Sequence, residues 1–583
     1  MKVRDKATPR PNLRSGRRFL RLAVDYWNND GNKWAVRGVS LLLLALTVAQ
    51  VGFAIWISYW HRDLFDALEN RQHAELLRLV LVFALIFIFT MAVTALHLTV
   101  KRWLQLDWRR WLTGLLLDQW LAHSRHYRLQ FIGGEHDNPD GRIAEDVKIA
   151  TETAIALAHS LLFSVLILGS FVDILLSVSG SAVLPGTSIF IPGYMVLMAF
   201  LYAGVGSVLG LMLGRPLIRA TNRLQTVEAN LRFGLARVRE HSEAIALMHG
   251  GPSERRHAGH LFADVGMGWN RQTLAYLGIV SFSTGYGTLL PVFPILIAAP
   301  QYVAGMMTLG LLMQAAQAFQ RLTSALSWPI DNLGEIARCR ASIDRIITFR
   351  EGMERLKRED RENGHGVSRI ELHRGHRTEL EIRRLCLDNA DGQPLLVDFD
   401  LVVRHGERIL VTGDPAVTVA LFKAVAGLWP WGHGEIFLPA GHDIVFAAQR
   451  PYLHVGSLRE VLAYPFLGAQ YKESALHWAL ECVGIGWLQS RLDDTEDWAR
   501  VLPLRAQQRL GIARLFLQQP QWVFIGEATD AFDARDEVAT FELLHRELPN
   551  AALLNISRHK EQAGGFYNRH LELYPPGFSP PEE

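Results

Sequence analysis

The sequence predicts two domains: an α-helical domain with six membrane spans in the first 350 residues, and an α/β domain in the C-terminal third. Three observations support this prediction. Long stretches of the first part contain no Asp, Glu, Lys or Arg, and the segments between them alternate between strongly basic and weakly basic or uncharged. The last third contains a strand, a glycine turn and a helix in that order. A chain of 583 residues also exceeds what one hydrophobic core normally holds.

The predicted spans are the stretches free of charged residues. About 20 helical residues cross a bilayer core. Thr273–Gln320 is long enough for two crossings, and we expect the break near Pro300–Tyr302. The other four predicted spans are Gly38–Trp60, Leu79–Val100, Thr153–Phe171 and Gly193–Gly214. So many long apolar stretches favour a membrane protein over a large soluble one.

The charges of the connecting segments predict the topology. The leader and the segments after the second and fourth spans are rich in Lys and Arg, whereas segments 177–192 and 298–305 are uncharged. Lys and Arg collect in cytoplasmic loops, so both termini are expected in the cytoplasm. The leader lacks the layout of a signal peptide. A net charge of +2 gives no field for nucleic acid, and three scattered cysteines predict neither a zinc site nor a disulfide framework.

Composition also predicts the domain boundaries. The expected parts are a basic cytoplasmic leader (1–35), the membrane domain with long cytoplasmic helices (36–350), a charged linker (351–379), the α/β domain (380–575) and a disordered tail (576–583).

The start of the α/β domain has the context of a phosphate-binding loop, which is a P-loop NTPase-like feature. A strand, Arg408–Thr412, enters Gly413, and a helix is expected over Ala420–Leu428. Such a loop binds phosphate through backbone N–H groups and a lysine. Here no Lys or Arg stands between Gly413 and Ala420, Pro415 has no N–H, and Asp414 adds a negative charge. Each lost charge-assisted hydrogen bond is worth roughly 1.5–3 kcal/mol, so a turn that serves only the fold is the favoured interpretation.

Other positions of this domain also bear on phosphate chemistry. Gln449 follows a strand and is suited to a metal or a water. Leu504–Arg509 opens a helix, and a helix N-terminus can hold an anion, but the glycine and serine that close approach would require are absent here. The apolar strand Trp522–Ile525 ends in Gly526, where a metal-binding aspartate would be needed, so no metal ligand is expected. Glu527 follows as a candidate general base.

These features together resemble the ATP-binding cassette (ABC) transporter family. The resemblance is strongest to half-transporters with fused permease and ATPase, the group of bacterial peptide-antibiotic and cobalamin importers and peroxisomal fatty-acyl transporters. It covers nearly the whole chain, and its motifs are Trp108–Leu112, Asp137–Asp146, Ser242–Ala246, Leu311–Gln314 with Ala325–Trp328, and Gly427–Gly432. The resemblance implies a membrane domain like that of type-1 ABC exporters and a P-loop NTPase-like cassette.

The resemblance also implies roles for individual residues, with ATP and Mg²⁺ as cofactors. Nucleotide-binding positions correspond to Gly413, Thr418, Gln449 and Gln507, and catalytic positions to Glu527 and His559. Residues for coupling or transmembrane function are Asp137, Arg142, Glu145, Asp146, Glu243 and Asp173. The departures fall on the chemistry: the phosphate loop is one residue short and lacks its lysine, the LSGGQ-type segment 502–509 lacks its serine and glycines, and Gly526 replaces the metal aspartate.

Three interpretations of function remain open at this stage. The first is a transporter of peptide-like or amphipathic solutes in the lipid bilayer with impaired ATP binding and hydrolysis, for which a proton gradient is one candidate energy source. Asp173, near the end of the third span, suits proton coupling, although an interfacial carboxylate explains it equally well. The second is a conventional ATP-driven transporter, and the third a non-transporting structural or regulatory subunit. A homodimer is expected, with a heterodimer as the alternative.

Overall fold

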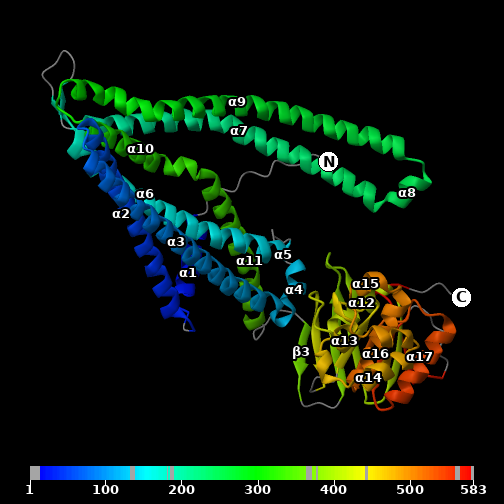
Figure 1. Ribbon diagram of the computed structural model, residues 1–583. Helices are drawn as coiled ribbons and strands as arrows, with labels where there is room; N and C mark the ends of the chain where they lie inside the picture. The colour runs from blue at the N-terminus through cyan, green and yellow to red at the C-terminus, as the bar shows by residue number, and fades with distance from the viewer. Residues whose placement is uncertain are drawn as a thin grey trace. The chain divides into compact units, whose positions relative to one another are not determined.

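The computed structural model describes residues 13–29, 31–131, 138–179, 181–183, 190–362, 370–375, 379–439, 444–557 and 565–578. The chain forms two compact units. One contains residues 1–120 and 133–353, and the other contains residues 121–132 and 354–583. The first unit is helical and the second is a mixed α/β domain, as the sequence predicted (Figure 1).

Long helices build the first unit. Within the described residues, five of them are long and apolar enough to cross a membrane, which makes the chain a multi-pass membrane protein. The helices of this unit are α1 (Leu13–Trp27), α2 (Lys33–Glu69), α3 (His73–Leu121), α6 (Val147–Ser179), α7 (Tyr194–Glu240), α8 (Ser242–Leu247), α9 (Gly251–Val303), α10 (Leu309–Asp331) and α11 (Leu333–Glu362). Shorter helical turns connect α3 to α6: η1 (Ala122–Ser124), α4 (Arg125–Arg128), η2 (Leu129–Phe131), α5 (Pro139–Gly141) and η3 (Arg142–Asp146).

The sixth predicted span corresponds to α10, which is not among the five apolar helices. It carries Gln314, Gln317, Gln320 and Arg321, which lower its mean hydropathy. Yet α10 packs against α2, α6, α7 and α9, and one side of it is buried from Gly310 to Thr323. A helix surrounded by other helices needs less lipid-compatible surface than one at the rim. The predicted break also moves, because α9 continues through Pro300 to Val303.

Helices α7 and α9 lie side by side, with α8 joining their far ends (Figure 1). They contain 47 and 53 residues, and a helix rises about 1.5 Å per residue. Both are therefore much longer than the roughly 30 Å hydrocarbon core of a bilayer. The Ser242–Ala246 motif forms α8 at the tip of this projecting pair.

Two sheets and their helices build the second unit. The first sheet has the strand order β13-β6-β12-β11-β8 with all neighbours parallel, and the second has the order β3-β7-β4-β5. The strands of these sheets are β3 (Ile370–Arg374), β4 (Leu380–Asp388), β5 (Pro394–Val403), β6 (Arg408–Gly413), β7 (Gly432–Leu438), β8 (Ile444–Ala448), β11 (Trp522–Gly526), β12 (Ala552–Ile556) and β13 (Arg569–Leu573). The main helices are α12 (Pro415–Val425), α13 (Leu458–Ala463), α14 (Glu473–Cys482), α15 (Trp498–Val501), α16 (Leu504–Gln518) and α17 (Ala534–Glu547). Short strands and turns complete it: β9 (Gly456–Ser457), β10 (Thr495–Glu496), η4 (Gly468–Gln470) and η5 (Gly486–Arg491), while β1 (Ser181–Val183) and β2 (Phe190–Pro192) pair in the first unit.

The parallel sheet explains where chemistry would occur in this unit. Its buried strands read as continuous apolar runs, such as Trp522–Ile525, which is typical of a sheet covered on both faces. Gly413, Ala448 and Gly526 end three of its strands, and Gly526 lies beside Ala448 in the register. The carboxyl ends of parallel strands are the usual place for ligand binding in such sheets.

One segment far away in sequence belongs to the α/β unit. Residues 121–132, from the connection between α3 and α6, cluster with it. The ring of Phe131 meets the ring of Trp431 edge-on with centroids 5.1 Å apart, and Trp431 in turn meets Trp429. No sequence motif marks this segment. The contact brings the connection between two membrane spans onto the surface of the α/β unit.

Candidate nucleotide site and coupling segments

The turn after β6 is too short to enclose a phosphate group. Strand β6 ends at Gly413 and α12 begins at Pro415, so only Asp414 lies between them. Gly413 has φ +123°, and a β-carbon there would collide with the carbonyl of Leu573 on β13. The backbone N–H of Asp414 donates to the same carbonyl at 2.8 Å. Gly413 is thus required by close packing against β13.

The Asp414 side chain occupies the N-terminus of α12. Its Oδ1 accepts hydrogen bonds from the N–H groups of Ala416 at 2.8 Å and Val417 at 3.3 Å. An N-cap aspartate with proline at the first helical position is a common way to begin a helix. The N–H groups that would otherwise be available to an anion are therefore bound to a carboxylate of the chain itself.

The polar and basic residues of α12 are also engaged elsewhere. The Thr418 hydroxyl is buried and donates to the carbonyls of Asp414 and Pro415 at 3.2 and 3.3 Å. The Lys423 ammonium lies over the ring of Trp429, 5.8 Å from its centroid. These contacts do not fit a bound magnesium nucleotide, since neither a hydroxyl for the metal nor a cation for the phosphates faces the turn.

A phenyl ring fills the space beside Gly526. A β-carbon at position 526 would lie 3.1 Å from the ring of Phe422 on α12. Phe422 also meets Phe446 edge-on, with centroids 5.5 Å apart. Gly526 is where the resemblance requires the metal aspartate, so the structure places an apolar ring against that position.

Glu527 begins a turn that is held by hydrogen bonds with two glutamines, Gln449 and Gln508. Its backbone has φ +55°, and its N–H donates to the carbonyl of Ile556 at 3.1 Å. Gln449 donates to the carboxylate of Asp530 at 2.9 Å. Buried Gln508 donates to the carbonyl of Gln449 and accepts from the N–H of Ala531, each at 3.0 Å. Gln449 therefore holds two loops together in this structure.

The start of α16, the LSGGQ-type segment, is held by charges within the same chain. Arg505 pairs with Asp533 at 3.2 Å and with Asp536, and Arg509 pairs with Asp536 at 2.7 Å. Burial and the neighbouring Arg505 guanidinium lower the pKa of Arg509 from its usual range. The side chain of Gln507 turns back and donates to the carbonyls of Ala499 and Leu502, both at 2.8 Å. Asp533 also caps α17 by accepting from the N–H of Asp536.

Two of the predicted coupling residues near α6, Arg142 and Asp146, belong to an ion-pair group around a buried carboxylate. Asp146 is only 4 % exposed, and its Oδ2 accepts from Nε of Arg345 at 2.8 Å, while Oδ1 accepts from the same guanidinium. Arg142 lies 3.1 Å from the same carboxylate. Arg345 comes from α11, 199 residues later in the sequence, and was not predicted. The group fastens the start of α6 to α11.

The remaining predicted residues are less engaged. Glu145 and Glu243 are exposed, Glu243 in the first turn of α8. Asp173 is exposed on α6, between buried Phe171 and Ile174. Asp137 and His559 lie outside the described residues.

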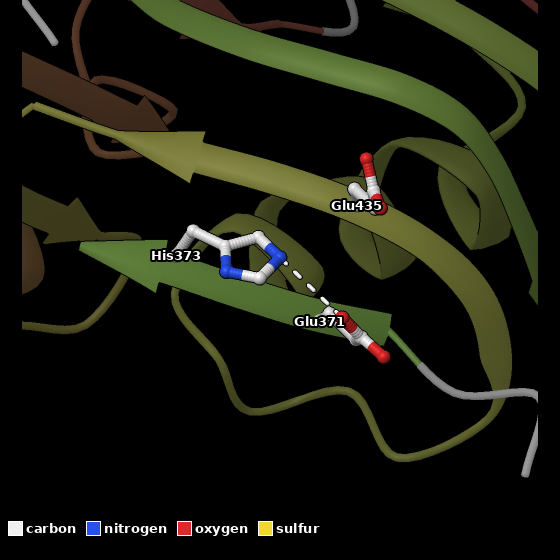
Figure 2. A group of neighbouring side chains, drawn as sticks. All are labelled: Glu371, His373 and Glu435. Carbon is white, nitrogen blue, oxygen red and sulfur yellow. Dashed lines mark ion pairs between the residues drawn. The ribbon is translucent and has the colours of Figure 1, made fainter. Parts of the chain in front are cut away.

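A surface cluster of Glu371, His373 and Glu435 has possible metal ligands within 4.8 Å of one another (Figure 2). Glu371 and His373 come from β3, and Glu435 comes from β7 directly opposite Glu371. His373 Nε2 lies 3.4 Å from Glu371 Oε2. Exposed acidic groups commonly lie together without an ion, and the pairing of β3 with β7 already places Glu435 opposite Glu371. No sequence pattern pointed to it.

Comparisons with known proteins agree with this architecture. Residues 31–287 match the family of the ABC transporter transmembrane region 2. The chain is 28% identical over 548 residues to the inner membrane ABC transporter ATP-binding protein YddA of Escherichia coli, covering 93% of this chain and 94% of that protein. It is 26% identical over 626 residues to the chloroplastic ABC transporter D family member 2 of Arabidopsis thaliana, covering 96% and 86%. It is 24% identical over 570 residues to the human lysosomal cobalamin transporter ABCD4, covering 92% and 91%.

The matches extend over both units, since the relatives align along nearly the whole chain. They agree with the half-transporter group that the motifs resemble. The helical first unit and the parallel-sheet second unit are what that group requires. The chain is therefore similar along nearly its whole length to ABC transporters, and its first unit matches their membrane region.

Proposed function

We propose that this half-transporter works as a dimer that moves a peptide-like or amphipathic solute across the bacterial inner membrane, with a cassette that binds ATP weakly or not at all. The observation that carries the proposal is the Asp414 carboxylate on the N-terminus of α12. A phosphate group at this turn would have to displace that carboxylate and then remain near its negative charge. Two like charges about 4 Å apart repel by roughly 4 kcal/mol near a protein surface.

The rest of the cassette supports the same conclusion. Phe422 packs beside Gly526, and Arg505 is neutralised by Asp533 and Asp536. In this family each ATP lies between one cassette's phosphate loop and the LSGGQ-type helix of the partner. Both halves of such a site are altered in this chain, so a homodimer would contain two altered sites.

The exposed tip of α7–α9 supports the dimer. Leu247 and Met248, where α8 ends, are 76% and 74% exposed, on a part of the pair that projects beyond the bilayer thickness. The cassette has its own exposed apolar side chains, Tyr452 and Val455, just after Gln449. We infer that α8 of one copy docks on this region of the other copy. The cassettes then hold the two membrane domains together, or transmit conformational changes from one to the other.

The positions of the basic segments support a topology with both termini in the cytoplasm. The energy source follows from the cassette: with weak ATP binding, transport depends on a gradient of the solute or of protons. A conventional ATP-driven transporter is the second candidate. The position of Glu527 at the end of β11, where a general base is expected, favours it.

Binding of a fluorescent ATP analogue and Mg-ATPase activity of the purified full-length protein test the proposal. We expect analogue binding and activity near the background of empty detergent micelles. Uptake by proteoliposomes, driven by a solute or proton gradient, should be unchanged by Glu527→Gln. Asp530→Asn is the matched control, because it alters the Gln449 contact and leaves Glu527 in place.

Three results would contradict the proposal. Strong ATPase activity abolished by Glu527→Gln would make the conventional transporter the better account. Absence of uptake under any gradient would favour a non-transporting subunit. A single copy per detergent particle by native mass measurement would contradict the dimer.

A further inference from the structure

A cavity lies between α7 and α9, close to where the charge-free stretches of these two helices end. Its volume is about 520 Å³, within the range of small-molecule sites. Three of its eight lining residues are arginines: Arg219 and Arg223 of α7, and Arg271 of α9. The other five are apolar residues or glycine, and no Asp or Glu is among the eight. The cavity is therefore positively charged on one side and apolar on the other.

The packing of α7 on α9 brings the three arginines to the same level. Arg219 and Arg223 are four positions apart, so they share one face of α7. The side-chain amide of Gln272 on α9 donates to the hydroxyl of Thr221 at 3.0 Å. This contact sets the neighbouring Arg271 level with the turn between the two arginines of α7. Cations from both helices therefore meet at one cavity.

Nothing in the described part of the chain neutralises these three charges. None of the three guanidinium groups forms an ion pair or a side-chain hydrogen bond with a described residue. Other arginines of this unit have acidic partners, as Arg102 has in Glu152 at 3.8 Å. The nearest acidic residues along α7 and α9, Glu228 and Asp264, do not line the cavity. Like charges that converge repel one another, and an anion between them would relieve this repulsion.

The position of the cavity along the helices indicates the kind of anion. Leu274 and Ala275 of its lining belong to the charge-free stretch that begins at Thr273, whereas Arg219 follows the charge-free stretch that ends at Gly214. The cavity therefore lies at the boundary between the hydrocarbon region and the headgroups. The anions at that depth are the phosphate groups of lipids, and a guanidinium binds phosphate through two parallel hydrogen bonds. A lipid also supplies the apolar part that the other side of the cavity suits.

We propose that this cavity binds the headgroup of one anionic phospholipid. Arg219, Arg223 and Arg271 bind its phosphate group, and the start of an acyl chain lies against Leu274 and Ala275. The bound lipid ties α7 to α9 where the pair leaves the membrane. The site contains no residue of the cassette, so this inference goes beyond the proposed function and is tested separately from it.

Native mass spectrometry of the full-length protein in detergent, titrated with dioleoyl phosphatidylglycerol or dioleoyl phosphatidylcholine, tests the proposal. We expect one phosphatidylglycerol per chain to be retained, about tenfold more tightly than phosphatidylcholine, because several arginines act on one anionic headgroup. Arg219→Gln, Arg223→Gln and Arg271→Gln together should abolish this preference. The combination of Arg237→Gln, Arg255→Gln and Arg256→Gln removes the same charge from the same helix pair outside the cavity, and should retain the preference.

Inorganic phosphate distinguishes a lipid site from a site for a free anion. Added in millimolar excess, it should not displace the retained phosphatidylglycerol, because it lacks the apolar part that contacts Leu274 and Ala275. Displacement of the lipid by phosphate would overturn the proposal in favour of a free-anion site.

Substitutions that fill the cavity test the position of the lipid. Ala220→Phe should remove the retained phosphatidylglycerol, and Ala275→Leu, a milder change, should weaken its retention if the first variant does not fold. Ala263→Phe at an exposed position of α9 is the control and should leave retention unchanged. Size-exclusion profiles establish that each variant is folded. Equal retention of both lipids, a preference that survives the triple arginine change, or one that the control arginine change removes equally would overturn the proposal.

Discussion

The ring of Phe422 on α12 lies beside Gly526 at the end of β11, 3.1 Å from where a β-carbon of residue 526 would stand. The two residues are 104 positions apart, and Gly526 leaves room for the ring. A β-carbon at 526 would press on the Phe422 ring, which would have to move by a few tenths of an ångström. The glycine where the resemblance requires a metal-binding aspartate therefore also fits the packing of α12 against β11.

Gly526→Asp should therefore destabilise the cassette. The new β-carbon would press on the Phe422 ring and place a charge beside it, and overpacking alone costs typically 1–3 kcal/mol. Thermal unfolding of the purified protein should show a lower midpoint. Phe422→Ala combined with Gly526→Asp should recover part of the loss, and neither variant should gain Mg-ATP binding. Unchanged stability of Gly526→Asp would show that the ring moves freely.

Asp414→Ala should weaken the start of α12. Loss of an N-cap side chain costs about 1 kcal/mol, and here two N–H groups lose their acceptor. Asp414→Asn is the matched control, because asparagine caps helices equally well and carries no charge. Denaturant unfolding of the two variants should therefore differ. If Asp414→Asn acquires measurable ATP binding, the charge at this turn is the main obstacle to the nucleotide.

Arg345→Ala should be strongly destabilising. It leaves Asp146, which is 4 % exposed, with only Arg142 as its cationic partner, and breaking a buried ion pair typically costs 3–5 kcal/mol. Arg340→Ala is the control, since Arg340 and Asp344 form an exposed pair with a separation of 4.0 Å. Melting in detergent should separate the two variants. Combining Arg345→Ala with Asp146→Ala should cost less than the sum of the single changes, and additive losses would argue against a direct pair.

Gly310→Ala should disturb the joint between α2 and α10. The N–H of Gly310 donates to Asp66 Oδ1 at 2.8 Å, and that of Leu309 donates to Glu69 at 3.0 Å. A β-carbon at 310 would collide with the carbonyl of Arg62 and with the Asp66 carboxylate. Gly334→Ala in α11 is the control, because a β-carbon there meets open space. We expect lower stability and altered uptake only for Gly310→Ala. Equal stability and equal uptake of the two variants would show that the contact between α2 and α10 at Gly310 has no such role.

Several features of this protein could be predicted from local sequence. Long uncharged stretches must be helical in a bilayer, so the five apolar helices follow from composition. The strand over Leu380–Leu387 and the strand leading into Gly413 follow from apolar runs bounded by turn residues. The break before the sixth helix was predicted near Pro300–Tyr302, whereas α9 continues to Val303 and α10 begins at Leu309.

For the candidate nucleotide site, the sequence could show only which functional residues are missing. A missing lysine and a missing aspartate are visible in the sequence, whereas the groups that take their place come from elsewhere in the fold. Asp414 was predicted to repel phosphate, and the structure adds that its carboxylate caps α12. Nothing in the sequence connects Arg345 with Asp146, or Phe131 with Trp431, since both contacts join segments about 200 residues or more apart.

The sequence by itself therefore determined the helical and α/β domains and five of the six predicted spans, because hydrophobic runs and turn residues act over short distances along the chain. Only the tertiary structure decided which groups lie at the altered positions: Phe422 lies beside Gly526, and Asp533 and Asp536 pair with Arg505. It also decided that α10 packs against α2, α6, α7 and α9. The physical reason is that burial and charge pairing depend on which distant segments meet, and no local pattern specifies those meetings.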